Sequence, residues 1–347
     1  MSKLRKILYP FSILFGEITD MRNKAYDKNI LTSSTFDLPV IAVGNLSTGG
    51  TGKTPQVEYL IRLLNDTYKI AVLSRGYKRK SEGFQIADKD SNAQQIGDEP
   101  LQYFRKFEDI IVAVDTDRVN GINELQNLDI PPDIILLDDA FQHRKVNAGL
   151  NILLTTHEKL YIDDIVLPAG DLREKKSGAA RADIIIVTKC NKQLSEEEQF
   201  KTSQKLNPEL NQTVFFSKIV YEDSVKSKSD EIKIDELFNF DVLLVTGIAK
   251  TQPLIDFLNN KKIRFKHLKY PDHHNFTINE IGKIENEFLK ISNKKKIILT
   301  TEKDFVRTFE EVNNKVYYLP IITKFISNEN DFNKLIINYV QQNTRNS

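Results

Sequence analysis

The sequence predicts an α/β fold in which a large domain with a mostly parallel sheet is followed by a second, smaller α/β domain. Short aliphatic runs of strand length recur along the chain, and stretches with helical spacing lie between several of them. The runs are continuous rather than alternating, which suits strands buried on both faces of a parallel sheet. A length of 347 residues exceeds what one hydrophobic core usually fills, and this predicts two domains.

Six short apolar runs in the first part of the chain predict the strands of the large domain. A stretch with helical spacing follows the first of them. Such alternation is typical of a doubly wound arrangement with helices on the sheet. The predicted strands are 40–43, 70–73, 110–114, 134–137, 152–154 and 184–187, and the helical positions are Val57, Leu60, Ile61 and Leu64.

A change in composition separates the two predicted domains. Residues 222–235, EDSVKSKSDEIKID, are polar and rich in charge, which indicates a linker or a hairpin hinge. Aliphatic runs at 242–245 and 297–299 then predict strands of the smaller unit. The expected division is an N-terminal helix over 1–25, a core over 26–222, a hinge over 223–235 and the smaller domain over 236–347.

The N-terminal segment, residues 3–22, has the apolar spacing of an amphipathic helix. Its apolar stretch is too short to cross a bilayer, which needs about 20 apolar residues. The helix either lies on a membrane surface or packs against its own domain, and the pattern fits both. Pro10 either kinks this helix or marks its start. The apolar face comprises Leu4, Ile7, Leu8, Phe11, Leu14, Phe15, Ile18 and Met21, after the basic residues Lys3, Arg5 and Lys6.

Composition excludes several classes of protein. Basic and acidic residues nearly cancel, 49 against 48, which disfavours a nucleic-acid binder driven by overall positive charge. The single cysteine, Cys190, cannot form an internal disulfide, and no CxxC pair or Cys/His cluster indicates structural zinc. A reducing, cytoplasmic setting is expected. Nothing in the sequence indicates an obligate protein partner.

A glycine-rich loop follows the first predicted strand. Residues 43–55, VGNLSTGGTGKTP, depart once from the phosphate-binding pattern G-x-x-x-x-G-K-[ST], because Ser47 stands where the first glycine is expected. Gly49 and Gly50 keep the freedom to adopt positive φ that Ser47 lacks. Strand, loop and helix occur in the order that the motif requires, and amides of such a loop and the dipole of the helix attract phosphates. The large domain is therefore predicted to be a P-loop NTPase-like core.

Two side chains at the end of this loop have predicted roles in binding a nucleotide. Lys53 would reach the β- and γ-phosphates, and the Thr54 hydroxyl would bind Mg²⁺. Magnesium-dependent phosphoryl transfer also needs acidic groups at neighbouring strand ends. Asp138 and Asp139, in IILLDDAFQH, follow a predicted strand and resemble a Walker B element. A helix cap is the alternative, but a cap does not need two adjacent carboxylates.

A kinase with an alcohol acceptor also needs a group that removes the hydroxyl proton. Asp98 and Glu99, in QQIGDEPLQYF, are on their own explained by the helix that they precede, since acidic residues favour a helix N-terminus. PDHHNF, at 271–276, offers His273 and His274, but adjacent histidines point in different directions, which makes a weak metal site. One catalytic histidine supported by a carboxylate from the other domain fits better.

Basic residues cluster after the strand that ends at Leu73. SRGYKRK carries Arg75 and three further cations beside Tyr77. Arg118 and Arg173 lie in segments that could also follow strand ends. Arginine suits bidentate contact with phosphates, so the cluster favours an anionic substrate, although each cation taken singly is explained by solvation.

Eight segments in order connect these features to a known family. They are VGNLSTGGTGKTP, LSRGY, GDEP, LLDDAFQH, LPAGDLRE, TGIA, PDHH and LTTEKD. In that order they closely resemble the tetraacyldisaccharide 4'-kinase family, from the N-terminal helix to about Arg307. The resemblance implies a peripheral enzyme of the cytoplasmic face of the inner membrane. Its implied reaction transfers the γ-phosphate of ATP to the 4'-hydroxyl of a tetraacyl glucosamine disaccharide 1-phosphate, which gives the lipid A precursor lipid IVA.

The resemblance also implies roles for the site residues. Asp98 would be the catalytic base, paired with His273, and domain closure would have to bring the two together across the predicted hinge. An enzyme docked on the membrane through its N-terminal helix would reach the lipid headgroup without extracting acyl chains. The implied catalytic residues are Asp98, His273 and Lys53; the ATP-binding residues are Ser47, Thr48, Gly49, Gly50, Thr51, Gly52, Lys53 and Thr54; the Mg²⁺ ligands are Thr54, Glu99, Asp138 and Asp139; and the substrate-binding residues are Arg75, Tyr77, Gln142, His143 and Arg173.

A membrane-associated ATPase switch of the deviant Walker type is the alternative. Those proteins carry a signature lysine just before the two glycines, and Thr48 stands at that position here. A GTPase fits less well, because TKCN at 188–191 lacks the carboxylate that would read guanine.

Overall fold

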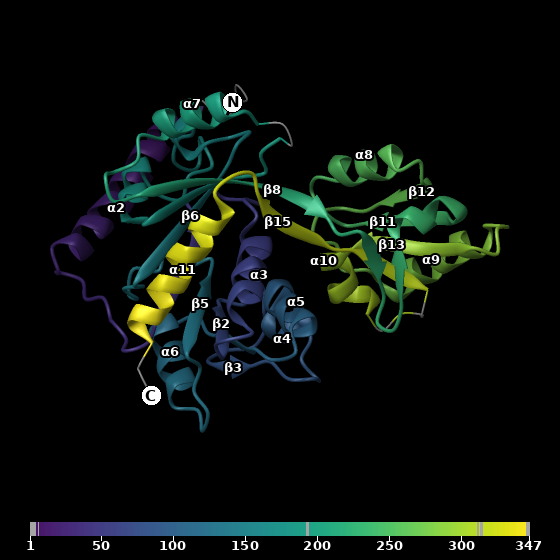
Figure 1. Cartoon of the computed structure of the whole chain (residues 1–347), viewed down its shortest axis with the longest axis horizontal. Coiled ribbons are helices and arrows are strands. Elements are labelled where there is room, and N and C mark those ends of the chain that lie inside the picture. The colour runs from purple at the N-terminus through teal and green to yellow at the C-terminus, as the bar shows by residue number, and fades with distance from the viewer. Residues whose placement is uncertain (1–4, 6, 192–193, 311, 313–314, 345–347) are drawn as a thin grey trace.

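The computed structural model describes residues 5, 7–191, 194–310, 312 and 315–344. Figure 1 shows two lobes, each built on its own sheet and joined by a pair of strands. We call residues 5–221 together with 321–344 the core lobe, and residues 222–320 the small lobe. The predicted α/β class is confirmed.

The core lobe contains a nine-stranded sheet with the order β15-β8-β7-β6-β1-β5-β2-β4-β3. The strands from β8 to β4 run parallel, whereas β15 and β3 are antiparallel edges. Each apolar run predicted in the first part of the chain falls on one of these strands. They are β1 (Val40–Asn45), β2 (Ile70–Ser74), β3 (Gln85–Ile86), β4 (Ile111–Val114), β5 (Ile134–Asp138), β6 (Leu150–Thr156), β7 (Ile184–Thr188), β8 (Thr213–Tyr221) and β15 (Ile321–Phe325).

Helices cover both faces of this sheet. Ile41 and Val43 of β1 share a hydrophobic cluster with side chains of α3, α5 and α11, whereas Val40 and Ala42 share another with side chains of α6. The alternation follows the two-residue period of a strand, and it explains why the runs are apolar at every position. The helices of the core lobe are α2 (Tyr9–Asp27), α3 (Lys53–Leu64), α4 (Ala93–Ile96), α5 (Asp98–Lys106), α6 (Arg118–Gln126), α7 (Glu196–Leu206) and α11 (Glu329–Asn343), with 3-10 turns at Tyr161–Asp163 and Lys176–Arg181.

The small lobe contains a six-stranded sheet with the order β10-β9-β14-β13-β11-β12. Its apolar core lies between β11, β13 and α8 and includes Val242, Leu254 and Ile297. The strands are β9 (Ser224–Lys226), β10 (Glu231–Lys233), β11 (Asp241–Thr246), β12 (Arg264–Lys269), β13 (Lys296–Thr301) and β14 (Val316–Leu319). The helices are α8 (Gln252–Asn260), α9 (Ile278–Leu289) and α10 (Glu302–Asp304), which continues into a π-helical turn over Phe305–Phe309, and a 3-10 helix covers Ile234–Asn239.

The last part of the chain differs from the expected domain division. Residues 236–347 are predicted as one smaller domain, but β15 pairs with β8 in the core sheet, and α11 packs on that sheet through Phe332, Ile336 and Val340. The predicted hinge, 223–235, is the β9–β10 hairpin at the edge of the small sheet, where polar residues meet solvent. The lobes are instead connected by β8 and β15 (Figure 1).

The packing of α11 makes a stability prediction. Phe332 is fully buried, and its ring lies 4.5 Å from that of Phe325 and 5.3 Å from that of Phe215, between ring centroids. Phe332→Ala should therefore lower the free energy of unfolding by about 3–5 kcal/mol, because it leaves a cavity in the core lobe. Urea denaturation followed by circular dichroism measures this change.

Leu335→Ala on the same helix is the matched control, since Leu335 is 41% exposed whereas Phe332 is fully buried. The control should change the free energy of unfolding by less than about 1 kcal/mol. Equal, small effects of both substitutions would show that α11 does not belong to the core lobe in solution.

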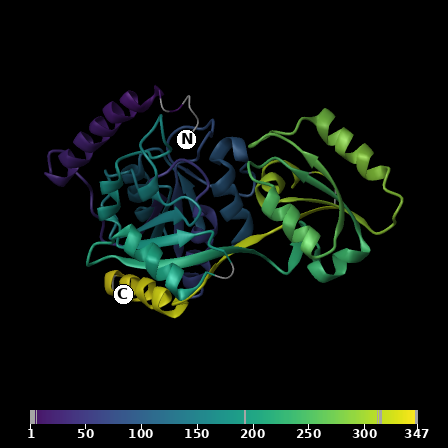
Figure 2. The ribbon, with the colours of Figure 1, turned by 90° about the horizontal axis from the view of Figure 1, so that it is seen from above.

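The N-terminal helix α2 lies on the outside of the core lobe (Figure 2). It begins at Tyr9, and Pro10 occupies its first turn, so the proline marks the start of the helix rather than a kink. In the first half of the helix the inward face is formed by small side chains, since Ser12 and Gly16 are buried and the Ser12 hydroxyl accepts a hydrogen bond from the Ala169 amide at 2.9 Å. Near its end the helix buries Tyr26. The predicted helical residues Lys3, Leu4 and Lys6 lie outside the described residues.

The apolar face of α2 is exposed. Phe11 is 62% exposed and Leu14 is 61% exposed, which is unusual for large apolar side chains in a globular protein. Within the described part of the chain, no helix combines the length and apolar character needed to span a membrane. The exposed face continues through Ile7, Leu8, Tyr9, Ile13, Phe15, Ile18 and Met21.

Candidate active site

The glycine-rich loop joins β1 to α3, as predicted. Gly52 caps α3 with φ 92°, and Gly49 has φ 107°, so both glycines occupy the conformation for which they are needed. Ser47 forms an antiparallel bridge with Leu172, and the neighbouring Thr48 amide donates to the Asp171 carbonyl at 2.7 Å. This strand-like pairing suits any residue. The first glycine of the usual motif is therefore not required in this loop.

The far side of the loop is held by the end of β7. The Thr188 hydroxyl donates to the Thr51 carbonyl at 2.6 Å, and the Lys189 ammonium donates to the Gly50 carbonyl. Lys189 was not predicted as a site residue, although it lies in the TKCN segment considered for guanine binding. These bonds use carbonyl groups and do not occupy loop amides, although the Thr48 and Thr51 amides already donate to the Asp171 and Gly49 carbonyls.

Lys53 meets an acidic group at the floor of the loop. Its ammonium lies 3.2 Å from Asn45 Oδ1 and 3.6 Å from Asp139 Oδ1. Arg173 binds the same carboxylate, with Nη2 2.8 Å from Asp139 Oδ1. Burial alone would raise the pKa of Asp139, but Lys53 and Arg173 lower it below its ordinary value. Asp139 is therefore ionised and holds both cations beside the loop.

Asp138 is the last residue of β5 and is fully enclosed. Burial, with the neighbouring Asp139 charge, raises the pKa of Asp138 to about 7. Its Oδ1 atom is buried and has no hydrogen-bond partner among the described residues. An unpaired buried carboxylate oxygen is costly, and it is usually explained by a bound cation or an ordered water. The carboxylate pair thus lies next to the loop, as the Walker B interpretation predicted.

The donor set suits Mg²⁺, which prefers oxygen ligands and is usually held by one or two carboxylates together with substrate phosphates. Asp138 offers the free oxygen, and Thr54 follows Lys53 at the start of α3. Across the described residues, no group of three or more His, Cys, Asp or Glu side chains is arranged to hold a metal. A Mg²⁺ held by Asp138 would take its remaining ligands from nucleotide phosphates and water.

The predicted substrate residues divide into two sets. Gln142 is engaged within the site, because its amide donates to the Asn45 carbonyl and to Glu174 Oε1, both at 3.0 Å. His143 lies beside Arg118, whose amide approaches its Nε2 atom at 3.4 Å. Burial, with the Arg118 charge, lowers the pKa of His143 to about 4, so this ring is neutral at physiological pH.

Arg75 and Tyr77 form the second set and project from the surface after β2. Tyr77 is 63% exposed. Arg75 is exposed as well and is close enough to the buried Arg118 for their charges to interact. The sequence places Arg118 only near a possible strand end. In the structure this arginine is almost completely buried, and its Nη1 donates to the Asp115 carbonyl at 2.7 Å. A buried arginine of this kind cannot be recognised from sequence spacing.

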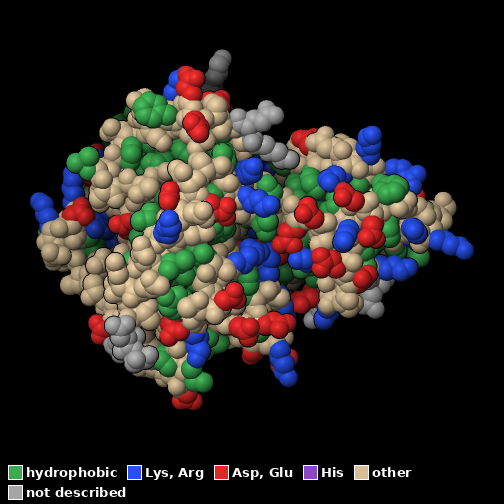
Figure 3. All heavy atoms as spheres, viewed as in Figure 1, with side chains coloured by type: hydrophobic (Ala, Val, Ile, Leu, Met, Phe, Trp, Pro, Cys, Tyr) green, Lys and Arg blue, Asp and Glu red, His purple; other side chains and the backbone are tan. Residues whose placement is uncertain are grey.

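Charged side chains gather where the two lobes meet (Figure 3). Lys189, which holds the loop, is close enough to Lys250 and Lys303 of the small lobe for their charges to interact. Asp98, the first residue of α5, lies 3.5 Å from His273, between Oδ2 and Nδ1. The predicted pair is therefore already adjacent in this structure, and no further closure is needed to bring the side chains together. Glu99 pairs with Lys303 of the small lobe at 2.7 Å. Burial alone would raise the pKa of Glu99, but the Lys303 ammonium lowers it below its ordinary value.

His274 points away from this pair, as expected for adjacent histidines. Its Nε2 atom lies 3.0 Å from Glu280 Oε1, and its ring stacks on Tyr270 with 5.1 Å between centroids. His273 itself has φ 55° and its amide donates to the Gly247 carbonyl at 3.0 Å. The TGIA and PDHH segments thus support one histidine in the site and use the other for packing.

Comparisons with known proteins give the family. The family model described as tetraacyldisaccharide-1-P 4'-kinase (LpxK) matches residues 4–341. The chain belongs to this family. The tetraacyldisaccharide 4'-kinase of Flavobacterium johnsoniae is 51% identical over 99% of both chains, and that of Flavobacterium psychrophilum is 52% identical over 100% of both. A solved structure of LpxK from Aquifex aeolicus in complex with ATP matches 97% of this chain and 99% of that chain, with a TM-score of 0.78 and 31% identity.

Proposed function

We propose that this kinase transfers the γ-phosphate of ATP to the 4'-hydroxyl of a tetraacylated disaccharide 1-phosphate, the reaction that gives the name of its family. One observation carries this proposal. The core lobe carries both a phosphate-binding loop and a carboxylate, Asp98, that is paired with a histidine of the small lobe, and Glu99 beside Asp98 is close enough to Asp138 for their charges to interact. A phosphoryl donor and an alcohol acceptor could therefore meet between them. The comparison structure of an LpxK with ATP supports ATP as the donor.

The loop residues 47–54 would bind the phosphates of ATP through their amides and through the N-terminus of α3. Lys53 would exchange its contact with Asp139 for the β- and γ-phosphates. Thr54, Asp138, Asp139 and Glu99 are the proposed Mg²⁺ ligands, and Glu99 would have to release Lys303 to take that role. When bound, Mg²⁺ would neutralise charge on the phosphate oxygens.

The transfer itself needs few groups from the protein. The 4'-hydroxyl would approach the γ-phosphorus in line, and Asp98 would accept its proton as the new oxygen–phosphorus bond forms. The bond between the γ-phosphorus and the bridging oxygen breaks, and ADP leaves. Lys53 stabilises the charge on the transferred group. Arg75, Tyr77, Gln142, His143 and Arg173 are the proposed substrate-binding residues, and the arginines would face the anionic groups of the substrate.

A direct assay tests this function. The purified protein, ATP and the tetraacylated disaccharide 1-phosphate should give a lipid with one more phosphate and one ADP per lipid, detected by mass spectrometry. A deviant Walker switch would only hydrolyse ATP under these conditions. That alternative is not favoured, because the chain belongs to a kinase family and Thr48 stands at the position of the signature lysine.

We further propose that α2 docks the enzyme on the cytoplasmic face of the inner membrane, where its lipid substrate would lie. In its first half the helix buries only Ser12 and Gly16 against the core lobe and leaves its large apolar side chains exposed, while Tyr26 near its end is buried. An amphipathic helix of this kind binds in the interface by burying its apolar face among the headgroups. The helix therefore explains how a protein without a spanning helix in its described residues could reach a lipid substrate.

Changing Phe11 and Leu14 together to serine tests this docking. The double variant should bind anionic phospholipid vesicles at least about tenfold more weakly, because two large apolar side chains no longer enter the interface. Cosedimentation with vesicles measures the change. An Ile130→Ser, Ile278→Ser double variant is the control, since both isoleucines are exposed elsewhere on the surface. Equal vesicle binding by the two double variants would contradict a role for α2.

A further inference from the structure

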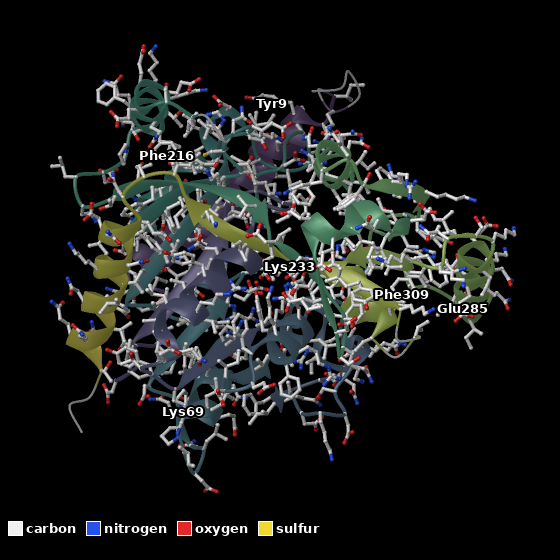
Figure 4. All side chains as sticks on the ribbon, turned by 45° about the vertical axis from the view of Figure 1, so that its right-hand side comes forward. Tyr9, Lys69, Phe216, Lys233, Glu285 and Phe309 are labelled. Atoms are coloured by element: carbon white, nitrogen blue, oxygen red, sulfur yellow. The ribbon has the colours of Figure 1, made fainter. Side chains whose placement is uncertain are left out.

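Arg307 lies at the lobe junction and contacts both members of the Asp98–His273 pair. Its Nε donates to Asp98 Oδ2 at 2.9 Å, and its Nη2 donates to the same oxygen. The Nη2 atom also lies 3.2 Å from His273 Nδ1. The arginine comes from the π-helical turn that follows α10 in the small lobe, where Figure 4 labels Phe309. It is 209 residues from Asp98 in sequence, and no sequence pattern had assigned it a role.

The chemistry of arginine decides how this contact works. A guanidinium group only donates hydrogen bonds, so His273 Nδ1 must be the acceptor and the ring proton must lie on Nε2. In that tautomer Nδ1 has no proton to give to Asp98, and the 3.5 Å approach between the two is not a hydrogen bond from the histidine. Arg307 is therefore the group that links the carboxylate to the imidazole.

Both donors converge on a single oxygen of Asp98. Nε and Nη2 of Arg307 bind Oδ2, and neither occupies Oδ1. One carboxylate oxygen is thus fixed by a charged, planar partner while the other is left for the acceptor hydroxyl. A carboxylate held in this way has its orientation set before substrate arrives, which is the condition for efficient proton removal.

Arg307 is in turn supported by the same groups that hold His273. Its Nη1 lies 3.4 Å from Asp304 Oδ1, and Asp304 Oδ2 accepts hydrogen bonds from the Gly247 amide at 2.9 Å and the Thr301 hydroxyl at 2.7 Å. The Gly247 carbonyl accepts the amide of His273. Asp304 therefore fixes the arginine and the histidine loop together within the small lobe.

The environment of Arg307 keeps it rigid and charged. Its side chain is only 5% exposed, so solvent competes little for its donors. Burial alone would lower the pKa of Arg307, but the Asp98 and Asp304 carboxylates raise this pKa above its ordinary value. A buried, permanently charged fork is suited to hold two other groups in a fixed geometry.

We propose that Arg307 is a positioning residue for phosphoryl transfer, which holds Asp98 and His273 in a fixed relative orientation across the lobe junction. The proposal rests on the proposed function, and it deepens that function by adding a residue that acts through the base rather than on the substrate. Lys303, one turn earlier, makes a single-point contact with Glu99 and cannot replace the fork.

Arg307→Ala and Arg307→Lys test the proposal in the full-length protein. With the disaccharide lipid and ATP, Arg307→Ala should lower kcat about 100-fold, as expected when a catalytic group loses its orientation, and should leave the KM for ATP within about twofold. Arg307→Lys keeps the charge but not the fork, and should still lose about tenfold in kcat. Added guanidinium should restore part of the activity of Arg307→Ala. Arg264→Ala, which removes an exposed arginine paired with Asp241, should keep full activity and show no response to guanidinium.

A double-mutant cycle separates positioning from a structural ion pair. In an Asp98→Asn background, Arg307→Ala should cost less than about threefold in kcat, because the arginine acts through the carboxylate that this variant has already removed. The proposal is overturned if Arg307→Ala or, should that variant not fold, Arg307→Lys keeps kcat within threefold of the unsubstituted protein. It is also overturned if the effects of Arg307→Ala and Asp98→Asn multiply. An unsubstituted protein that fails to phosphorylate the lipid would instead contradict the proposed function.

Discussion

Asp98→Asn should lower kcat for lipid phosphorylation by about 10²–10⁴-fold, the range that a general base usually contributes. Asparagine has the same shape as aspartate and still offers an oxygen to Arg307, but it cannot accept the hydroxyl proton. The variant should bind ATP normally, because the contacts of Asp98 are with Arg307 and His273 and not with the loop. Steady-state kinetics gives the loss in kcat, and isothermal titration calorimetry gives the affinity for ATP.

Asp241→Asn is the matched control for this experiment. Asp241 also pairs with an arginine of the small lobe, Arg264 at 3.1 Å, but the pair lies at the start of β11 and away from the junction. The control variant should keep full activity. If Asp98→Asn retains kcat within about threefold, Asp98 is not the base, and Arg307 cannot act by orienting the base.

The strands of the core sheet were predictable because of their burial. Strands β1, β2, β5 and β7 are buried at every position, so their sequences are apolar up to a polar last residue and stand out from their surroundings. The missed strand β8 is different, since its second half leaves the sheet core to connect the lobes and includes Lys218 and partly exposed residues. A strand that is buried along only half of its length has no single hydrophobic pattern.

The position of α11 could not be predicted for another reason. Its buried residues Phe332, Ile336 and Val340 follow the spacing of an amphipathic helix, which predicts an apolar face. The spacing does not say which sheet the face covers. Assigning the helix to the nearer domain in sequence was therefore wrong, and only the pairing of β15 with β8 brings it back to the core lobe.

The candidate site shows the same limit. The loop and the Asp138–Asp139 pair are local features, because each is a short segment at the end of one strand. The sequence therefore predicted both at neighbouring strand ends. Arg307 and Lys189 depend on contacts between segments more than a hundred residues apart. The roles of the predicted site residues are proposals. The conformation of the loop explains why Ser47 is tolerated, because the backbone of Ser47 pairs with Leu172 and does not need positive φ.

Lys53→Met should have the broadest effect of the substitutions in the loop. The methionine is an unbranched side chain one atom shorter than lysine and carries no charge, so it should lower kcat/KM for ATP by about 10²–10³-fold, as expected when one preorganised donor to the developing charge is lost. The loop should stay folded, because Asp139 keeps Arg173 as a partner and the carbonyls of Gly50 and Thr51 stay bound to the end of β7. Steady-state kinetics with varied ATP measures the loss, and the melting temperature reports on folding.

Lys201→Met controls for the removal of a lysine, since Lys201 is exposed on α7 and pairs only with Glu197 among the contacts described for it. Its kcat/KM should equal that of the unsubstituted protein. A variant at Lys53 that kept kcat/KM within tenfold would mean that the transferred phosphate does not lie above this loop. The Asp98–His273 pair would then have no phosphoryl group to act on, and the proposed reaction would have to be abandoned together with the nucleotide site.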